Sequence, residues 1–137
     1  MRRTMLKGKI HRATVTAASV DYAGSITIDS GLMAFADILA HEQVHVLDVD
    51  NGARLVTYAI PGRPGEICVN GAAARRVAVG DRVIIISYAE FTGEELTSYR
   101  PRIVLVDEDN RISRVEAAAD CTGMENSTVV HTHLKGD

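Results

Sequence analysis

The sequence predicts a mainly β fold that closes into a small barrel, and three observations support this prediction. Short runs that are rich in β-branched residues, or that alternate polar with apolar residues, recur along the 137-residue chain, as strands require. An Asn-Gly pair separates two of these runs and is typical of β-hairpins, because both residues tolerate positive φ. Only one stretch has a helical period. Several short strands with one helix favour a small closed barrel.

The strands are expected, in chain order, at residues 10–16, 25–29, 44–50, 53–60, 67–70, 82–89 and 102–107. The last two are almost continuously aliphatic, as in strands that are buried on both faces. The strands at 44–50 and 53–60 are joined through Asp50-Asn51-Gly52, which predicts a hairpin. The sequence Pro-Gly-Arg-Pro-Gly at 61–65 predicts a turn.

One helix is expected over residues 31–40, with Ser30 as its N-terminal cap. Its apolar residues recur at a spacing that forms one stripe on a helix surface. They are Leu32, Phe35, Ala36 and Leu39. The sequence therefore places this helix directly after the strand that begins at Ser25.

The chain is expected to form one domain over residues 1–116, followed by a mobile C-terminal tail over 117–137. Beyond Glu116 the residues have no sustained periodicity. We find no internal repeat and no low-complexity linker, so the sequence does not predict a second domain.

Charge and composition argue against several functional classes. A net charge of −3, without a basic stripe, makes nucleic acid an unexpected partner. The charged start of the chain is not followed by an apolar run long enough for a signal peptide or a membrane span, so we expect a cytoplasmic protein. Cys68 and Cys121 could pair in principle, but no disulfide framework surrounds them, and both are expected to be free thiols.

The dipeptide Gly24-Ser25 is a candidate site of intramolecular chemistry. Glycine allows strained backbone geometry and leaves its carbonyl open to the neighbouring serine hydroxyl. A turn glycine before the first residue of a strand explains the same dipeptide equally simply. The dipeptide alone does not decide between these interpretations.

A second candidate site lies on the strand at 53–60. The two-residue period places Arg54, Val56, Tyr58 and Ile60 on one face, where a fixed cation and a phenol could converge on a small ligand. An exposed strand face with an extended Arg and a hydrogen-bonded Tyr is the alternative. The small residues of Asn70-Gly71-Ala72-Ala73-Ala74 would let backbone amides approach a ligand, although the first turn of a helix explains them as well.

Two pairs of histidines have spacings that metal sites use. His41 and His45 are four residues apart, and His131 and His133 are two apart, spacings that ligands can use. No Cys or acidic residue completes a recognisable ligand set with them. We therefore expect no native metal site.

Taken together, these segments resemble the bacterial aspartate alpha-decarboxylase family from Thr4 to about Asp107. The motifs, in the order that makes the resemblance specific, are Thr4-Met5-Leu6-Lys7-Gly8-Lys9-Ile10-His11-Arg12, Thr16, Tyr22-Ala23-Gly24-Ser25, Asn51-Gly52-Ala53-Arg54, Thr57-Tyr58-Ala59-Ile60, Val69-Asn70-Gly71-Ala72-Ala73-Ala74 and Gly80-Asp81. The turn at 61–65 is shorter than the family's usual loop, and the tail beyond Glu116 resembles nothing in the family. Ser19 and Asp21 replace residues that are more common before the family's cleavage site.

The resemblance implies a six-stranded double-psi β-barrel with one or more short helices, assembled as a homotetramer. It also implies a proenzyme that cleaves itself between Gly24 and Ser25 into a β chain of residues 1–24 and an α chain of residues 25–137. Ser25 would become a pyruvoyl group that forms a Schiff base with L-aspartate. The products would be carbon dioxide and β-alanine, and the β-alanine would supply pantothenate biosynthesis.

The resemblance assigns a role to each matching residue. Tyr58 would be the proton donor, and Thr57 would stabilise the oxyanion of self-cleavage. Alternation places Thr57 on the opposite strand face from Tyr58, so either a bulge redirects it or it serves a different part of the site. The remaining substrate-binding residues would be Lys9, Arg54, Asn70, Gly71, Ala72 and Ala73.

Two other functions stay open at this point. An unprocessed β-barrel binding module would keep the fold without the chemistry, and a metal-dependent hydrolase would use the histidines. The requirement for a separate maturation factor is also open.

Overall fold

The computed structural model describes residues 1–117 and 128–130. Most of the predicted C-terminal tail, residues 118–127 and 131–137, lies outside the described part, and so does Cys121. Among the described residues, no helix is long and apolar enough to cross a membrane.

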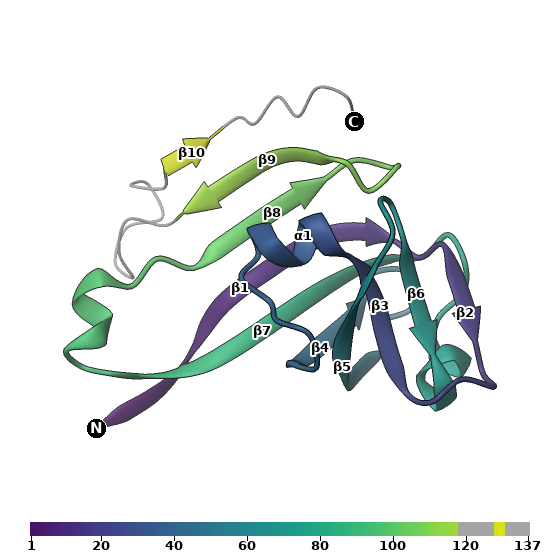
Figure 1. The fold of residues 1–137 in the computed structure, drawn as a ribbon, viewed down its shortest axis with the longest axis horizontal. Coiled ribbons are helices and arrows are strands. Elements are labelled where there is room, and N and C mark those ends of the chain that lie inside the picture. Colours follow the sequence, from purple (N-terminus) through teal and green to yellow (C-terminus); the bar gives the residue numbers. More distant parts are fainter. Residues whose placement is uncertain (118–127, 131–137) are drawn as a thin grey trace.

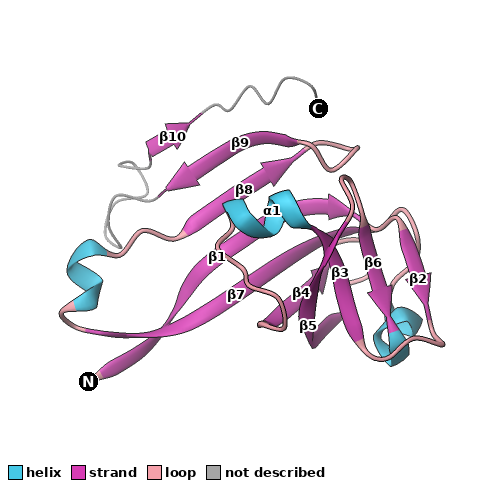
Figure 2. Ribbon diagram, in the orientation of Figure 1, coloured by secondary structure: helices cyan, strands magenta, loops and turns pink. Residues whose placement is uncertain are grey.

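The described chain is mainly β, as predicted, with three short helical segments (Figure 2). The strands are β1 Arg2–Thr14, β2 Ala17–Ser19, β3 Ser25–Asp29, β4 Gln43–Asp48, β5 Arg54–Gly62, β6 Ile67–Asn70, β7 Arg82–Thr92, β8 Arg102–Val106, β9 Ile112–Ala117 and β10 Thr128–Val130. The helical segments are α1 Ser30–Phe35, η1 Gly71–Arg76 and η2 Glu95–Ser98. The double-psi topology stays a prediction.

The strands pair in the order β10-β9-β8-β1-β7-β4-β5-β3-β6-β2. The long strands β1 and β7 pair antiparallel and run diagonally across the molecule, with β8, β9 and β10 on one side and β3, β6 and β2 gathered at one end (Figure 1). Strand β5 links the two regions, because it pairs with β4 in one sheet and parallel with β3 in the other. The residues of β5 therefore lie between the main sheet and the end that carries Ser25.

The expected helix is shorter than predicted and begins one residue earlier. Asp29, not Ser30, is the cap: its Oδ1 accepts hydrogen bonds from the amides of Gly31 at 2.7 Å and Leu32 at 3.3 Å. The helix ends at Phe35 because the chain turns into the left-handed region at Asp37, whose φ is 57°. Leu39, expected on the apolar stripe, is 70% exposed as a result.

The predicted hairpin is confirmed. Strands β4 and β5 pair antiparallel up to Leu47 and Arg54, and the turn between them has one residue at positive φ, Gly52 at 77°. The amide of Gly52 donates to the carbonyl of Asp48 at 2.9 Å, so the connection is longer than a two-residue turn. The hairpin places Arg54 at the start of β5.

The structure differs from the sequence prediction at several further places. Strand β1 begins at Arg2, earlier than the predicted strand at 10–16. The predicted turn at 61–65 starts later, because Pro61 and Gly62 continue β5 by pairing with Ile28 and Asp29 of β3. Strand β9 was not predicted, since its polar residues mask the two-residue period. The η1 helix forms where small residues follow β6, as the alternative interpretation of that segment predicted.

The core is aliphatic. Its largest fully buried side chains are Ile10, Ile26, Ile28, Leu32, Ile67, Ile85, Val15, Val44, Val46, Val69, Val83 and Val104. They come from most of the strands and from α1, so both regions of the molecule share one cluster. Burial of this apolar area is the main stabilising term, at roughly 25 cal/mol per Å² removed from water.

Candidate active site

Gly24 and Ser25 lie at the boundary between an exposed connection and a buried strand. Gly24 is exposed, whereas Ser25, the first residue of β3, is only 3% exposed. The Ser25 hydroxyl donates weakly to the carbonyl of Ala23, at 3.4 Å. The peptide that joins Gly24 to Ser25 is therefore held at one end by the sheet and is open at the other.

Asn70 is the cross-strand partner of Ser25. The two residues pair in the antiparallel register of β3 and β6, and Asn70 is 4% exposed. Its Nδ2 donates to Ser25 Oγ at 2.9 Å and to Thr27 Oγ1 at 3.1 Å. The structure thus brings together two of the predicted site residues, far apart in sequence, through a direct hydrogen bond.

Gly71 packs directly against the Gly24 segment. Its φ is +74°, and a Cβ built on it would lie 2.6 Å from Gly24 Cα and 2.8 Å from Gly24 N. Any residue with a side chain would be strained there and would collide with backbone rather than with a movable side chain. Ala72 and Ala73 follow Gly71 at the start of η1, where Ala72 is exposed and Ala73 is half-buried.

Arg54 and Tyr58 lie on one exposed face of β5, as the two-residue period predicted. The β4–β5 register runs without a shift from Gln43 paired with Tyr58 to Leu47 paired with Arg54. Thr57 pairs with the buried Val44 and points to the opposite, inward side. Because no bulge redirects Thr57, that alternative is wrong for this part of β5.

Tyr58 and Ser25 lie at the same end of a parallel strand pair. The β3–β5 register begins with Ile26 beside Ala59, the residues that follow Ser25 and Tyr58. Alternation puts Ser25 and Tyr58 on the same face, opposite the buried Ile26 and Ala59. The phenol is 37% exposed, and its ring lies 6.2 Å from that of His41 between centroids.

Lys9 shares the face of Arg54 and Tyr58 but lies several strands away. Lys9 pairs with Ile86, Ile86 with His45, and His45 with Val56, which stands between Arg54 and Tyr58 on β5. Neighbouring strands lie about 4.8 Å apart, so Lys9 is about 14 Å from β5 across the sheet. One chain does not bring Lys9 to the other predicted residues.

Cys68 is a free thiol, as the sequence predicts. Its Sγ lies 3.2 Å from Asn70 Oδ1 and donates to it. Burial, and then the charge of Glu66, raise the pKa of this thiol, so it stays protonated at neutral pH. The two-residue spacing from Asn70 on one strand was the signal that could have placed Cys68 on this face.

The sequence pattern does not predict the partly buried ion pair between Lys7 and Glu42. Lys7 Nζ lies 2.8 Å from Glu42 Oε2, which accepts a 2.6 Å hydrogen bond from Ser87. Burial opposes ionisation of Glu42, but the amide of Leu39, together with Lys7 and Ser87, outweighs it and lowers the pKa of this carboxyl. This pair joins β1 and β7 to the segment that precedes β4.

The histidines whose side chains the structure describes do not converge. The ring of His41 faces Tyr58, whereas His45 makes an edge contact with Tyr88 at 5.1 Å between ring centroids. His131 and His133 lie outside the described residues. Among the residues described, the group of acidic, His or Cys side chains close enough to share an ion contains no histidine.

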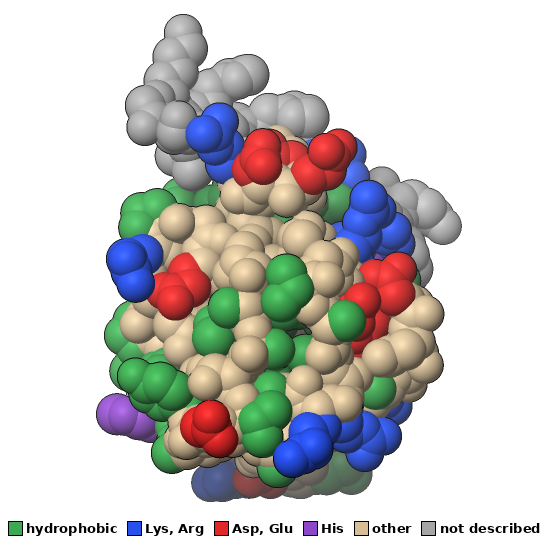
Figure 3. Space-filling model, turned by 90° about the vertical axis from the view of Figure 1, so that its right-hand side faces the viewer, with side chains coloured by type: hydrophobic (Ala, Val, Ile, Leu, Met, Phe, Trp, Pro, Cys, Tyr) green, Lys and Arg blue, Asp and Glu red, His purple; other side chains and the backbone are tan. Residues whose placement is uncertain are grey.

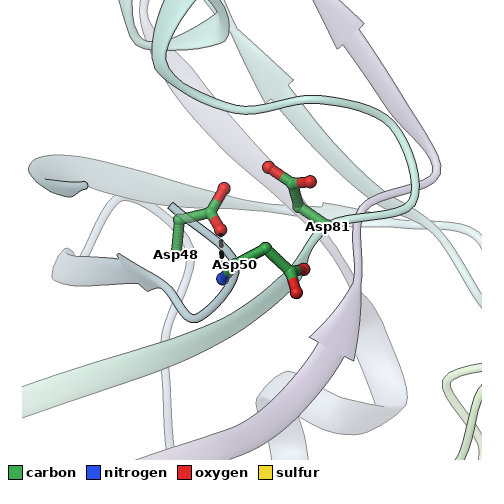
Figure 4. Close-up of side chains that lie close together, drawn as sticks. All are labelled: Asp48, Asp50 and Asp81. Carbon is green, nitrogen blue, oxygen red and sulfur yellow. Dashed lines mark hydrogen bonds between the residues drawn. The ribbon is translucent and has the colours of Figure 1, made fainter. Parts of the chain in front are cut away.

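That group is Asp48, Asp50 and Asp81, whose nearest carboxylate oxygens lie within 4.8 Å of one another (Figure 4). Asp48 is 2% exposed, and its Oδ1 accepts hydrogen bonds from the amides of Asp50 and Asn51. Its Oδ2 has no hydrogen-bond partner among the described residues. Burial and the neighbouring Asp81 raise the pKa of Asp48. The cluster holds the hairpin in place ahead of Arg54.

The end of the molecule at β2 and β6 carries the connection that contains Gly24 (Figure 1). Seen end-on, hydrophobic side chains lie toward the middle of this face and charged ones mostly at its margins (Figure 3).

The fold and the site define a mainly β protein whose candidate reaction centre is a buried serine behind an exposed glycine. A family model described as aspartate decarboxylase matches residues 1–113. The chain is 56% identical to an aspartate 1-decarboxylase of Listeria monocytogenes over 84% of this chain and 92% of the relative. It is 59% identical to one of Desulfitobacterium hafniense, over 80% of this chain and 88% of that protein. The chain belongs to the aspartate decarboxylase family.

Proposed function

We propose that this chain is made as a proenzyme, cleaves itself between Gly24 and Ser25, and converts L-aspartate to β-alanine and carbon dioxide in the cytoplasm. In this role it supplies pantothenate biosynthesis. Membership of the aspartate decarboxylase family supports the reaction. The observation that carries the site assignment is the 2.9 Å hydrogen bond from Asn70 to Ser25, beside an exposed Gly24.

Self-cleavage begins when Ser25 Oγ attacks the carbonyl carbon of Gly24. The new C–O bond replaces the C–N bond of the peptide, and the proton of the hydroxyl moves to the departing nitrogen, which leaves an ester. Loss of the Cα proton of residue 25 then expels the Gly24 carboxylate and leaves dehydroalanine at the start of the α chain. One water hydrolyses the imine tautomer of this residue, which releases ammonia and leaves the pyruvoyl group. Asn70 is suited to hold the Ser25 side chain in position, because it bonds Ser25 and Thr27 at once.

The surroundings of Ser25 fit a small ketone group in place of the serine. Asn70 offers a buried amide N–H, and Gly71 offers backbone that no side chain obstructs. Ala72 and Ala73 continue this surface with small side chains. A pyruvoyl group there supplies an electron sink for the loss of the substrate's α-carboxylate.

Arg54 and Tyr58 are the proposed substrate residues on the exposed face of β5. The planar guanidinium of Arg54 is suited to a bidentate contact with a carboxylate of aspartate. Tyr58 lies at the same end of its strand as Ser25 and on the same face, so its phenol is suited to return a proton to the substrate carbon. Thr57 points inward, which supports a role in a different part of the site rather than beside Ser25.

A second copy of the chain would complete the site. Lys9 is about 14 Å from β5 within one chain, and the face between them is apolar, with Val56 at 55% and Tyr88 at 39% exposure. Exposed apolar sheet faces of this kind are typical of subunit interfaces. A homotetramer packed through this face would bring Lys9 of one copy to Arg54 and Tyr58 of another.

The Ser25→Ala variant tests the proposal. Intact mass under denaturing conditions should resolve two chains from the wild type and one uncut chain from the variant, which forms no β-alanine. Cleavage of the variant, or a wild type that stays in one piece, would remove Gly24-Ser25 as the processing site. An uncut wild type that folds normally would support the alternative of an unprocessed binding module. If adding cell extract then caused cleavage, a separate maturation factor would be required.

A further inference from the structure

Four polar side chains form a square on one face of the β3–β6 pair. Cys68 and Asn70 stand two residues apart on β6, opposite Thr27 and Ser25 on β3. Hydrogen bonds link them through the amide of Asn70, which accepts from Cys68 Sγ at 3.2 Å and donates to Ser25 at 2.9 Å and to Thr27 at 3.1 Å. Asn70 is therefore bonded at both ends of its amide.

The side-chain amide of Asn70 can adopt two orientations, which differ in the positions of its oxygen and its NH2 group. A half-turn about the terminal bond of Asn70 would exchange the carbonyl oxygen and the NH2 group at almost no steric cost. Ser25 and Thr27 carry hydroxyls, which can either donate or accept, so they would tolerate both states. Cys68 favours the observed state, because its protonated thiol donates to the amide oxygen, whereas a thiol sulfur is only a weak acceptor for the NH2 group that would face it in the other state.

We propose that Cys68 is a positioning residue for the self-cleavage, fixing the Asn70 amide so that its NH2 group holds the Ser25 hydroxyl in place for attack on Gly24. The thiol itself does not touch the reacting atoms. Its pKa is raised by burial and then by Glu66, which keeps the donor proton in place at neutral pH. This inference rests on the proposed function, because it concerns the rate of that same cleavage.

The test compares variants that keep or remove the donor. Cys68→Ser retains an O–H that can donate to Asn70, whereas Cys68→Ala and the similarly sized Cys68→Val do not. Freshly made chains are incubated, and the cleaved fraction is followed over time by intact mass under denaturing conditions. We expect Cys68→Ala and Cys68→Val to slow cleavage by about tenfold and Cys68→Ser to remain within about threefold of the wild type, in line with the loss of one partly buried hydrogen bond.

Thermal unfolding of each uncut chain, made in the Ser25→Ala background, separates positioning from packing. If Cys68 had a purely structural role, cleavage of Cys68→Ser, Cys68→Ala and Cys68→Val would slow in proportion to the stability that each variant loses, and Cys68→Ser would not restore the rate. That result would overturn the proposal. Equal cleavage rates in all four chains would also overturn it. A wild type that does not cleave at Gly24-Ser25 would overturn both this inference and the proposed function.

A double variant tests whether Cys68 acts through Asn70. Asn70→Asp replaces the NH2 group with a second acceptor, so the orientation of the group no longer matters. Adding Cys68→Ala to Asn70→Asp should then change the remaining cleavage rate by less than about twofold. A further tenfold loss in the double variant would show that Cys68 acts by another route and would contradict the proposal.

Discussion

Asn70 Nδ2 donates a 2.9 Å hydrogen bond to Ser25 Oγ across the antiparallel pair formed by β3 and β6. The next residue, Gly71, leaves the strand at positive φ and passes against the backbone of Gly24. Two consecutive residues therefore contact the two partners of the proposed cleavage. Asn70 contacts the nucleophile Ser25, and Gly71 contacts the segment that contains Gly24.

Gly71→Ala should slow self-cleavage by about tenfold or more. The new Cβ would lie 2.6 Å from Gly24 Cα, so the scissile segment must move. Gly52→Ala is the matched control, because Gly52 also has positive φ, at +77°, but has nothing within 4 Å of its Cβ position. Both variants should lose about 1–2 kcal/mol of stability from left-handed strain, whereas intact mass should show delayed cleavage only for Gly71→Ala. Equal cleavage in both would dissociate Gly71 from the processing site.

Arg54→Ala should raise the KM for aspartate by about tenfold to a hundredfold, because a carboxylate loses a charge-assisted partner worth roughly 1.5–3 kcal/mol. Self-cleavage should stay normal, since Arg54 is not hydrogen-bonded to Ser25 or Asn70 in the described structure. Arg63→Ala, at an exposed turn, serves as the control for a change in net charge. Steady-state kinetics on fully cleaved protein make the measurement, and an unchanged KM would exclude Arg54 from substrate binding.

Tyr58→Phe keeps the ring and removes only the phenol. If Tyr58 returns the proton, β-alanine formation should fall by about a hundredfold, while the cleaved fraction and the amount of aspartate that borohydride fixes to the chain stay normal. Tyr88→Phe, on the exposed face of β7, is the control. A Tyr58→Phe enzyme with normal turnover would assign the proton to water or to another group.

Glu42→Gln should destabilise the uncut chain by roughly 1–3 kcal/mol, because the partly buried Lys7 would keep its contacts with Asp37 but lose its 2.8 Å ionic partner. The lowered pKa of Glu42 means that its contribution is present above the pKa of the unfolded carboxyl and is lost as the pH falls through the lower, folded value. Denaturant unfolding between pH 3 and 7 should therefore show a smaller acid-induced loss in Glu42→Gln than in the wild type. Glu90→Gln, at an exposed position, is the control and should show the same acid-induced loss of stability as the wild type. If Glu42→Gln also behaved like the wild type, the ion pair would contribute nothing to stability.

Asp48→Asn should leave stability unchanged or raise it by about 1 kcal/mol at pH 7. The raised pKa of Asp48 means that stability is greatest below its unfolded pKa and is lost as the pH rises through the folded value. Asn keeps an oxygen for the amides of Asp50 and Asn51 and removes the buried charge. Thermal unfolding at pH 3, below the unfolded pKa, and at pH 7 should show a smaller difference in stability for Asp48→Asn than for the wild type. Strong destabilisation at both would mean that the charge itself is required.

Much of the local structure followed from the sequence. The period of two placed Arg54 and Tyr58 on one exposed face and Thr57 on the other, because alternation in a strand is a local property of the backbone. The Asn-Gly pair fixed the hairpin, and the order of the motifs indicated the family before any contact was known. The end of α1 could not be predicted, since it depends on the left-handed turn at Asp37 rather than on the apolar stripe.

Tertiary structure alone decided which of these residues meet. Ser25 and Asn70 are 45 positions apart, and only the register of β3 with β6 makes them partners. The same pairing lets Cys68 reach Asn70 and sets Gly71 against Gly24. Lys9 shares a face with Arg54, yet the strand order separates them. The physical reason is that periodicity fixes the direction of a side chain, whereas its neighbours depend on long-range strand pairing, which no local pattern encodes.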